Sequence, residues 1–138
     1  RPCTEVLFLS AEKSLDACHA LILLALSEPS QNTLEVLVQE ARPGATRRVD
    51  LPGGASIEGR PLEADASCAL YRISFPSYVA YQVVDERFSL GGPPDDFTGS
   101  KFRRYSKSPF LDYIVATTAA SDENPRPGPL LHFCVVCE

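Results

Sequence analysis

Short apolar runs separated by turn-forming residues make up most of this sequence. Twelve prolines and eight glycines fall largely between the runs, and such punctuation favours short strands over long helices. The first run, residues 6–9, predicts a strand. The second, residues 15–26, fits either a buried helix capped by Ser14 or a turn followed by a buried strand from about His19.

The strand is the favoured interpretation of the second run because of the residues that follow it. Residues 27–32 are a cluster of turn formers. After them, apolar side chains stand at alternate positions, the period of a half-buried strand: Leu34, Val36 and Val38. Two such runs around a short polar loop predict a β-hairpin.

Further strands are expected in the middle of the chain. Residues 46–51 predict a short edge strand with Arg47 and Arg48 exposed, and residues 53–67 predict a loop with one short strand around Ile57. The clearest alternation lies in residues 69–85, at Tyr71, Ile73, Phe75, Val79, Tyr81 and Val83. It predicts one strand that bends at Pro76, and residues 91–96 predict a loop.

One α-helix is predicted near the C-terminal end. Ser108 is a favoured N-cap, and Pro109 is tolerated at the first helical position. Apolar side chains then fall on one helical face, at Phe110, Leu111, Ile114 and Val115. Asp112 suits the first turn because the helix dipole favours an acid there. The helix is expected to end near residues 117–118 and to be followed by a loop at 122–129.

Residues 130–137 are apolar almost throughout, which predicts a central strand buried on both faces, with Leu131, Phe133 and Val135 in the core. The whole pattern predicts a single globular domain, residues 1–138, of mainly β class. We expect an antiparallel sheet, curled or two-layered, with the one helix near residues 109–118. The alternative is an α+β fold with a second helix at residues 14–26.

Composition and charge narrow the function classes. The hydrophobic fraction is 44% and the charged fraction 22%, near the averages of ordinary globular proteins. A net charge of −5 disfavours nucleic-acid binding, which needs basic surface to displace counterions. No polybasic segment would hold the chain on an anionic membrane. The longest apolar run, residues 20–26, is far shorter than the about 20 residues that span a membrane.

The five cysteines, an odd number, match no small disulfide scaffold and predict reduced thiols in a cytoplasmic protein. No signal peptide is evident, although a start at Arg1 rather than Met leaves open the removal of an upstream segment. Cys134 and Cys137 have C-x-x-C spacing, but residues three apart on a strand point to opposite faces. We therefore expect no metal and no redox chemistry there.

The candidate catalytic groups are few. His132 and Cys134 would share one face of a strand and could form a thiolate–imidazole pair, but such positions normally only pack together. Asp85 and Glu86 fit a solvated strand end better than a pair of catalytic acids. Nucleophile-elbow, phosphate-loop and zinc-protease motifs are absent from the sequence. We therefore assign no catalytic residue, no metal and no cofactor.

A basic stretch before the helix is the most unusual local feature. Its residues are Lys101, Arg103, Arg104, Tyr105, Lys107 and Ser108. Cations beside a helix N-terminus can bind a phosphate or a carboxylate. If the stretch is extended, alternate side chains share a face, with Arg104 on the other side. The competing interpretation is that acids of the same chain, Asp95, Asp96 or Glu86, neutralise the row.

Three segments resemble parts of small bacterial single-domain proteins of unknown function: residues 78–86, 105–113 and 131–133. The resemblance implies a bacterial, cytoplasmic origin and the hairpin in the first half, and it carries over no functional residue.

Three functions follow from the sequence. The first is a non-catalytic binding domain that recognises another protein, as immunity proteins do. The second is a domain that binds a small anionic ligand at residues 101–108. The third is an enzyme whose site is assembled from dispersed residues such as Glu86, Tyr105 and His132.

Overall fold

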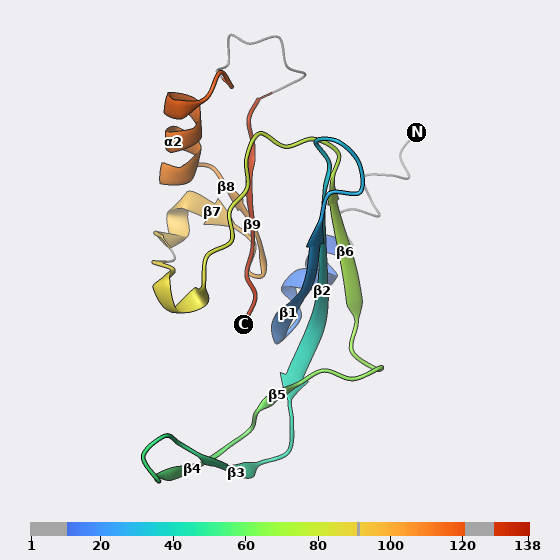
Figure 1. Ribbon diagram of the computed structural model, residues 1–138, viewed down its shortest axis with the longest axis vertical. Coiled ribbons are helices and arrows are strands. Elements are labelled where there is room, and N and C mark those ends of the chain that lie inside the picture. Colours follow the sequence, from blue (N-terminus) through green and yellow to red (C-terminus); the bar gives the residue numbers. More distant parts are fainter. Residues whose placement is uncertain (1–10, 91, 121–128) are drawn as a thin grey trace.

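The computed structural model describes residues 11–90, 92–120 and 129–138, and its strands form three antiparallel sheets (Figure 1). The mainly β class predicted from the sequence is confirmed. The strand expected at residues 6–9 and nearly all of the loop expected at 122–129 lie outside the described residues.

The first sheet is built on a long central strand, β2 (Leu34–Pro43). β1 (Ala20–Ser27) pairs along one side of it. On the other side lie β6 (Leu70–Phe75) and then β5 (Leu62–Glu63). β1 and β2 form the predicted hairpin, so the alternative helix at residues 14–26 is wrong. Among the described residues, the helix in this region covers residues 11–16 and ends there, because the apolar run that follows pairs its backbone with β2.

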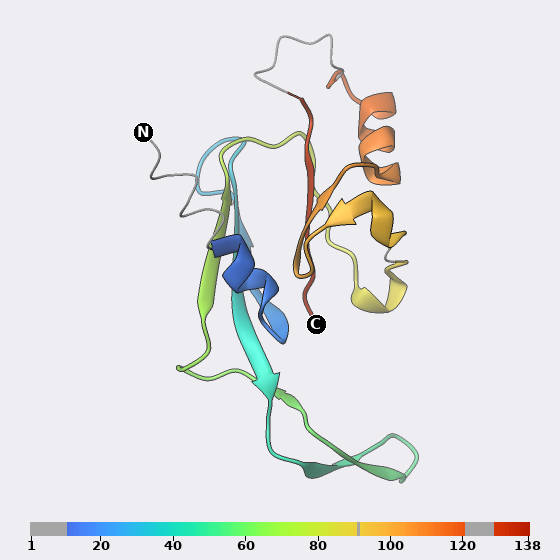
Figure 2. The same cartoon turned by 180° about the vertical axis from the view of Figure 1, so that it is seen from behind.

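The core lies on one face of this sheet. Val36 and Val38 of β2 are buried on that face, as their alternate spacing predicts. Leu21 of β1 and Leu15 of the 11–16 helix are buried beside them. The helix therefore packs its apolar side on the sheet, and in Figure 2 it crosses in front of β1 and β2.

The second sheet consists of β7 (Phe97–Thr98), β8 (Phe102–Tyr105) and β9 (His132–Val135), in that order. Its inner face contacts the core, with the rings of Phe75 and Phe133 6.0 Å apart. Its outer face carries α2 (Pro109–Thr117), through a ring contact of 5.3 Å between Phe110 and His132. The predicted helix is thus confirmed, and β9 runs between α2 and the first sheet (Figure 1).

The final strand differs from its prediction. Among the described strands, β9 pairs only with β8, so it lies at the edge of its sheet, and its four residues are half-buried. Phe133 and Val135, two of these four residues, were expected in the core, and Leu131, the third residue expected there, is 51% exposed. A run of apolar residues indicates burial, but it does not specify which elements cover the strand. The elements around β9 are the strand β8, part of the core and the short helix α2.

The strand predicted for residues 69–85 stops at Phe75. Pro76 follows, and a proline removes a donor from the ladder. Beyond Pro76 the chain makes side-chain contacts instead. The Tyr78 hydroxyl donates to the Glu28 carboxylate, and the rings of Tyr78 and Tyr81, one of the alternating residues, meet edge to face at 5.2 Å. The second half of that prediction is therefore wrong.

Short 3₁₀ turns follow in this part of the chain. η1 (Glu86–Phe88) is capped by Asp85, whose side chain accepts from the Arg87 N–H. η2 (Pro94–Asp96) lies in the predicted loop.

A two-stranded arm extends from the far end of β2. It consists of β3 (Arg47–Asp50), which was expected, and β4 (Ser56–Gly59), which contains the strand expected around Ile57. β5, after the arm, was not predicted. Figures 1 and 2 both show the arm projecting away from the two larger sheets. Its base is held by a hydrogen bond from Gly44 N–H to Pro61 O of 2.8 Å.

Candidate functional site

The basic stretch is extended at residues 102–105, the case that the sequence analysis considered, but it does not gather its side chains at one point. Phe102 pairs with Val135 and Arg104 with Phe133, so Phe102 and Arg104 share the inner face of the second sheet. Arg103 and Tyr105 lie on the outer face, toward α2. The two neighbouring arginines therefore point into different surroundings.

Three of the four cations contact other groups of the chain, Arg104 through the Phe133 ring at 5.8 Å. Lys101 Nζ lies 3.2 Å from a carboxylate oxygen of Glu138. The Arg103 guanidinium lies 4.4 Å from the centre of the Phe97 ring, and its Nε donates to Ser100 O at 3.1 Å. Lys107 is exposed and forms no ion pair within the described part of the chain.

None of the described ion pairs joins the basic stretch to Asp96 or Glu86, the acids expected to neutralise it. Among the described residues, one ion pair involves the stretch, and its acid is Glu138. Asp96 contributes its backbone oxygen, which accepts from the N–H of Ser106 at 2.8 Å. Glu86 lies in η1 and is exposed, and the side chain of Asp95 lies outside the described structure.

Ser108 connects the first turn of α2 to β9 through its side chain. It is 2% exposed, and its Oγ accepts from the Leu111 N–H at 3.1 Å as the N-cap of α2. The same Oγ lies 2.7 Å from Nδ1 of His132. Which of these two atoms donates is set by the tautomer of the His132 ring, because the serine hydroxyl can accept twice and donate once. The serine thus joins the start of α2 to β9.

His132 and the two cysteines near it, Cys134 and Cys137, are partly buried side chains whose pKa values are shifted by burial. The His132 ring stacks on Tyr105, with centroids 4.5 Å apart, and burial lowers the pKa of His132 from its ordinary value. Burial raises the pKa of Cys134 and of Cys137, which disfavours the reactive thiolate. Four cysteines are free in the described structure. The described residues contain no group of three or more His, Cys, Asp or Glu side chains that could hold a metal ion.

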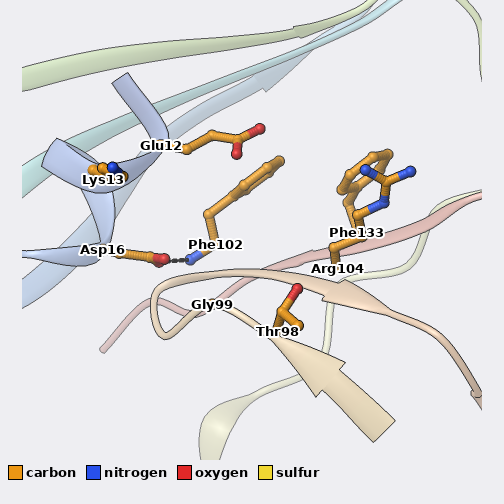
Figure 3. Close-up of a pocket in the computed structure, with 8 residues that line it drawn as sticks. All are labelled: Glu12, Lys13, Asp16, Thr98, Gly99, Phe102, Arg104 and Phe133. Atoms are coloured by element: carbon orange, nitrogen blue, oxygen red, sulfur yellow. Dashed lines mark hydrogen bonds between the residues drawn. The ribbon is translucent and has the colours of Figure 1, made fainter. Parts of the chain in front are cut away.

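Among the residues of the basic stretch, Arg104 lines the cavity described next. The cavity has a volume of about 260 Å³ and lies between the 11–16 helix and the second sheet (Figure 3). Its lining residues are Glu12, Lys13, Asp16, Thr98, Gly99, Phe102, Arg104 and Phe133.

Asp16 fixes one wall of this cavity. Its Oδ1 accepts three backbone N–H groups of the β7–β8 loop, from Ser100 at 3.0 Å and from Lys101 and Phe102 at 2.8 Å each. Gly99 allows this close approach because its φ of 91° places it in the left-handed region. The loop is a ready-made anion cradle, and the chain's own carboxylate fills it.

The remaining lining is aromatic and mixed in charge. Phe102 and Phe133 stack at 5.4 Å, and the Arg104 guanidinium lies 5.8 Å from the Phe133 ring centre. In Figure 3 the Phe102 ring points into the space between Glu12 and Phe133. Two acids and two cations balance the charge, and the volume is below the about 300–1,000 Å³ of common small-molecule sites. The geometry does not favour a dedicated anion site.

A second candidate is the outer edge of β1. Three of its leucines are exposed, Leu23 at 37%, Leu24 at 49% and Leu26 at 37%. Among the described residues, only Glu138 hydrogen-bonds to this edge, from its N–H to Leu21 O at 2.9 Å. The strand contains no charged residue and no proline. From Leu23 onward the edge is apolar, and no described segment pairs with it.

Comparison with known proteins adds no assignment: no family model, curated protein or solved structure matches this chain. In the described part of the chain, no helix has the length and apolar character to cross a membrane.

Apart from Arg104, sequence reasoning missed both candidate sites, each for its own reason. The run at residues 20–26 was expected to be buried, whereas β1 lies at the sheet edge. Asp16 gives no local signal, because the three N–H groups that it accepts lie more than eighty residues along the chain. Gly99 was the one available signal of a special turn.

Proposed function

We propose that this chain is a non-catalytic protein-interaction domain whose partner adds a strand to the open edge of β1. The observation that carries the proposal is the exposure of Leu23, Leu24 and Leu26 on an uncharged edge strand. In β-strand addition, unpaired backbone groups supply the hydrogen bonds, and apolar side chains on either face of the strand supply the contact area.

Natural proteins usually protect such edges. The common devices are lysines, prolines, short strands, covering segments and bulges. β1 has eight residues, without a charge or a proline. In the described structure its protection is a shift of register between Leu23 and Ala25 and the bond of Glu138 N–H to Leu21 O. An edge left this open is expected either to aggregate or to bind a partner.

The other two hypotheses draw less support from the geometry. An anionic ligand at residues 101–108 would need side chains that converge, and only Arg104 lines the cavity. An enzyme built on His132 would need an accessible nucleophile beside it, and the neighbouring Ser108 is buried. The free cysteines support a reducing compartment, so we infer that the interaction takes place in the cytoplasm.

The test is photo-cross-linking in the native host. A photoreactive amino acid is placed at Leu24, and in a matched control at Tyr113, which is exposed on α2. We expect a discrete cross-linked product from position 24 only. The purified partner should then bind Leu24→Lys at least about tenfold more weakly than the wild type. The same products from both positions, or an unchanged affinity of Leu24→Lys, would refute the proposal.

A further inference from the structure

The pairing of β1 with β2 shows which residues of β1 direct their backbone groups to the outer edge. On β2, the Glu40 N–H donates at 2.8 Å to the residue just before β6, on the side away from β1. Residues two apart in an antiparallel ladder bond to the same side, so Val38 and Val36 also bond toward β6. Leu23 and Leu26, which lie opposite them, therefore direct their N–H and C=O groups to the outer edge.

The chain itself makes one bond of this kind, at Leu21. Leu21 lies opposite Glu40, and its carbonyl accepts from the Glu138 N–H at 2.9 Å. The Glu138 carboxylate is held in turn by Lys101, 3.2 Å away. The outer edge thus accepts backbone hydrogen bonds in the folded chain, and the position at Leu21 is already taken. No described strand pairs with the edge beyond it, which leaves Leu23 and Leu26 as the bonding positions for an added strand.

The core-side face of the sheet is incompletely covered along this edge. Directly opposite residues share a face, so Leu23 and Leu26 lie on the same face as Val38 and Val36. Both valines are buried, whereas Leu23 and Leu26 each remain 37% exposed. A side chain added opposite either leucine would extend the core, and it must therefore be apolar.

The other face of the sheet carries polar groups. Ser27 and Ala25 lie on it, opposite Glu35 and Leu37, and both are exposed. A carboxylate oxygen of Glu35 lies 3.5 Å from Arg72 Nε on the same face. Side chains that an added strand directs to this face would meet solvent and polar neighbours. A strand that alternates between apolar and polar residues matches both faces.

We infer that the partner adds an antiparallel strand of alternating apolar and polar residues, with its apolar residues opposite Leu23 and Leu26. The inference rests on the proposed function, since it gives the chemistry of the strand that pairs with β1. Every described strand pair in this sheet is antiparallel, and that direction is the more stable per residue. In an antiparallel pair, residues opposite Leu23 and Leu26 exchange backbone bonds with them, so the apolar residues of the partner also donate its N–H groups.

A capped peptide of seven residues is the probe, with three valines alternating with two threonines between terminal lysines. The control peptide has the same composition with its valines consecutive. Titration into the nitrogen-15-labelled chain, followed by NMR, measures affinity and locates the site. We expect the amide signals of Leu23 and Leu26 to shift, and the alternating peptide to bind at least about fivefold more tightly than the control. Equal affinities, or no shift of these two signals up to about 5 mM peptide, would overturn the inference.

Methylation of one peptide nitrogen at a time tests the direction of the strand. The N–H of the central valine faces β1 in either frame that places two valines opposite Leu23 and Leu26, so its methylation should weaken binding at least about tenfold. The N–H of a threonine faces away from β1, and its methylation should change the affinity less than about twofold. The reverse result would indicate a parallel strand and contradict the inference.

A proline in β1 tests the same bonds from the side of the protein. Leu26→Pro removes an N–H that faces the outer edge, a position at which edge strands accept proline. Leu26→Ala is the matched control, because it also removes the leucine but keeps the N–H. We expect the proline variant to bind the alternating peptide at least about fivefold more weakly than the alanine variant, and equal binding would refute the inference. Circular dichroism checks the fold of both variants, and the methylated peptides test the same bonds on the unmodified chain.

Failure of this inference is distinguishable from failure of the proposed function. If position 24 cross-links to a protein whose contacting segment does not alternate, or runs parallel to β1, the proposed function stands and the inference is wrong. If position 24 gives no discrete product in the host, no partner pairs with β1, and both are wrong.

Discussion

Replacing Ser108 with alanine tests how α2 is attached to the rest of the fold. The serine Oγ makes two hydrogen bonds, one with the Leu111 N–H at the start of the helix and one with Nδ1 of His132 in β9. The side chain is almost fully buried, so water cannot enter to replace either bond. Ser108→Ala therefore removes a helix cap and a link between two elements together.

The expected loss is the sum of these two roles. Removal of a serine N-cap costs about 1 kcal/mol. A neutral buried hydrogen bond contributes about 1 kcal/mol, and a partner left unsatisfied adds to that cost. Nδ1 of the half-buried His132 would lose its partner. We therefore expect Ser108→Ala to lower the free energy of unfolding by about 2–3 kcal/mol, a large part of the usual 5–15 kcal/mol.

A double-mutant cycle in urea separates the two roles. In a His132→Phe background, Ser108→Ala should cost only the cap, about 1 kcal/mol. Ser106→Ala is the control, because the Ser106 hydroxyl donates to a backbone oxygen at an exposed site, and it should cost less than about 0.5 kcal/mol. A loss for Ser108→Ala below about 1 kcal/mol, or an equal loss in both backgrounds, would refute the reasoning.

Three more perturbations test other parts of the structure. Asp16→Ala should lower the free energy of unfolding by about 3 kcal/mol, because three N–H groups lose a charged acceptor. Asp16→Asn, which keeps an oxygen, should lose less, and equal losses would contradict this role. Gly99→Ala should cost more than about 2 kcal/mol in thermal unfolding, because its Cβ would overlap Phe102 O at a positive φ. Gly54→Ala, with a similar φ and open space around it, should cost about 1 kcal/mol. Burial lowers the pKa of His132 in the folded state, so stability should fall as the pH drops below the ordinary value of 6.5. His132→Gln should flatten urea stability between about pH 7 and pH 5, and an unchanged slope would exclude His132 as the cause.

The hairpin and α2 could be predicted because their signals are local. Alternating apolar residues at 34–38 and a turn cluster before them specify a strand and its reversal within about twenty residues. Ser108 and Pro109 mark a helix start through their own backbone and side-chain chemistry, without help from distant residues. A turn and a helix start depend on residues close in sequence, so the sequence alone is enough to predict them.

Pairing and burial, by contrast, were decided by tertiary structure. Residues 79–83 alternate as a strand would, yet no described strand pairs with them. The segment is held by side-chain contacts such as the hydrogen bond from the Tyr78 hydroxyl to Glu28. The leucines of β1 and the residues of β9 lie at sheet edges, since edge or centre depends on which segments arrive on either side. The cations of the basic stretch separate because two faces of β8 meet different surroundings. Asp16 acquires its role only when a loop from the far end of the chain folds over it, and that contact between distant residues leaves no local pattern.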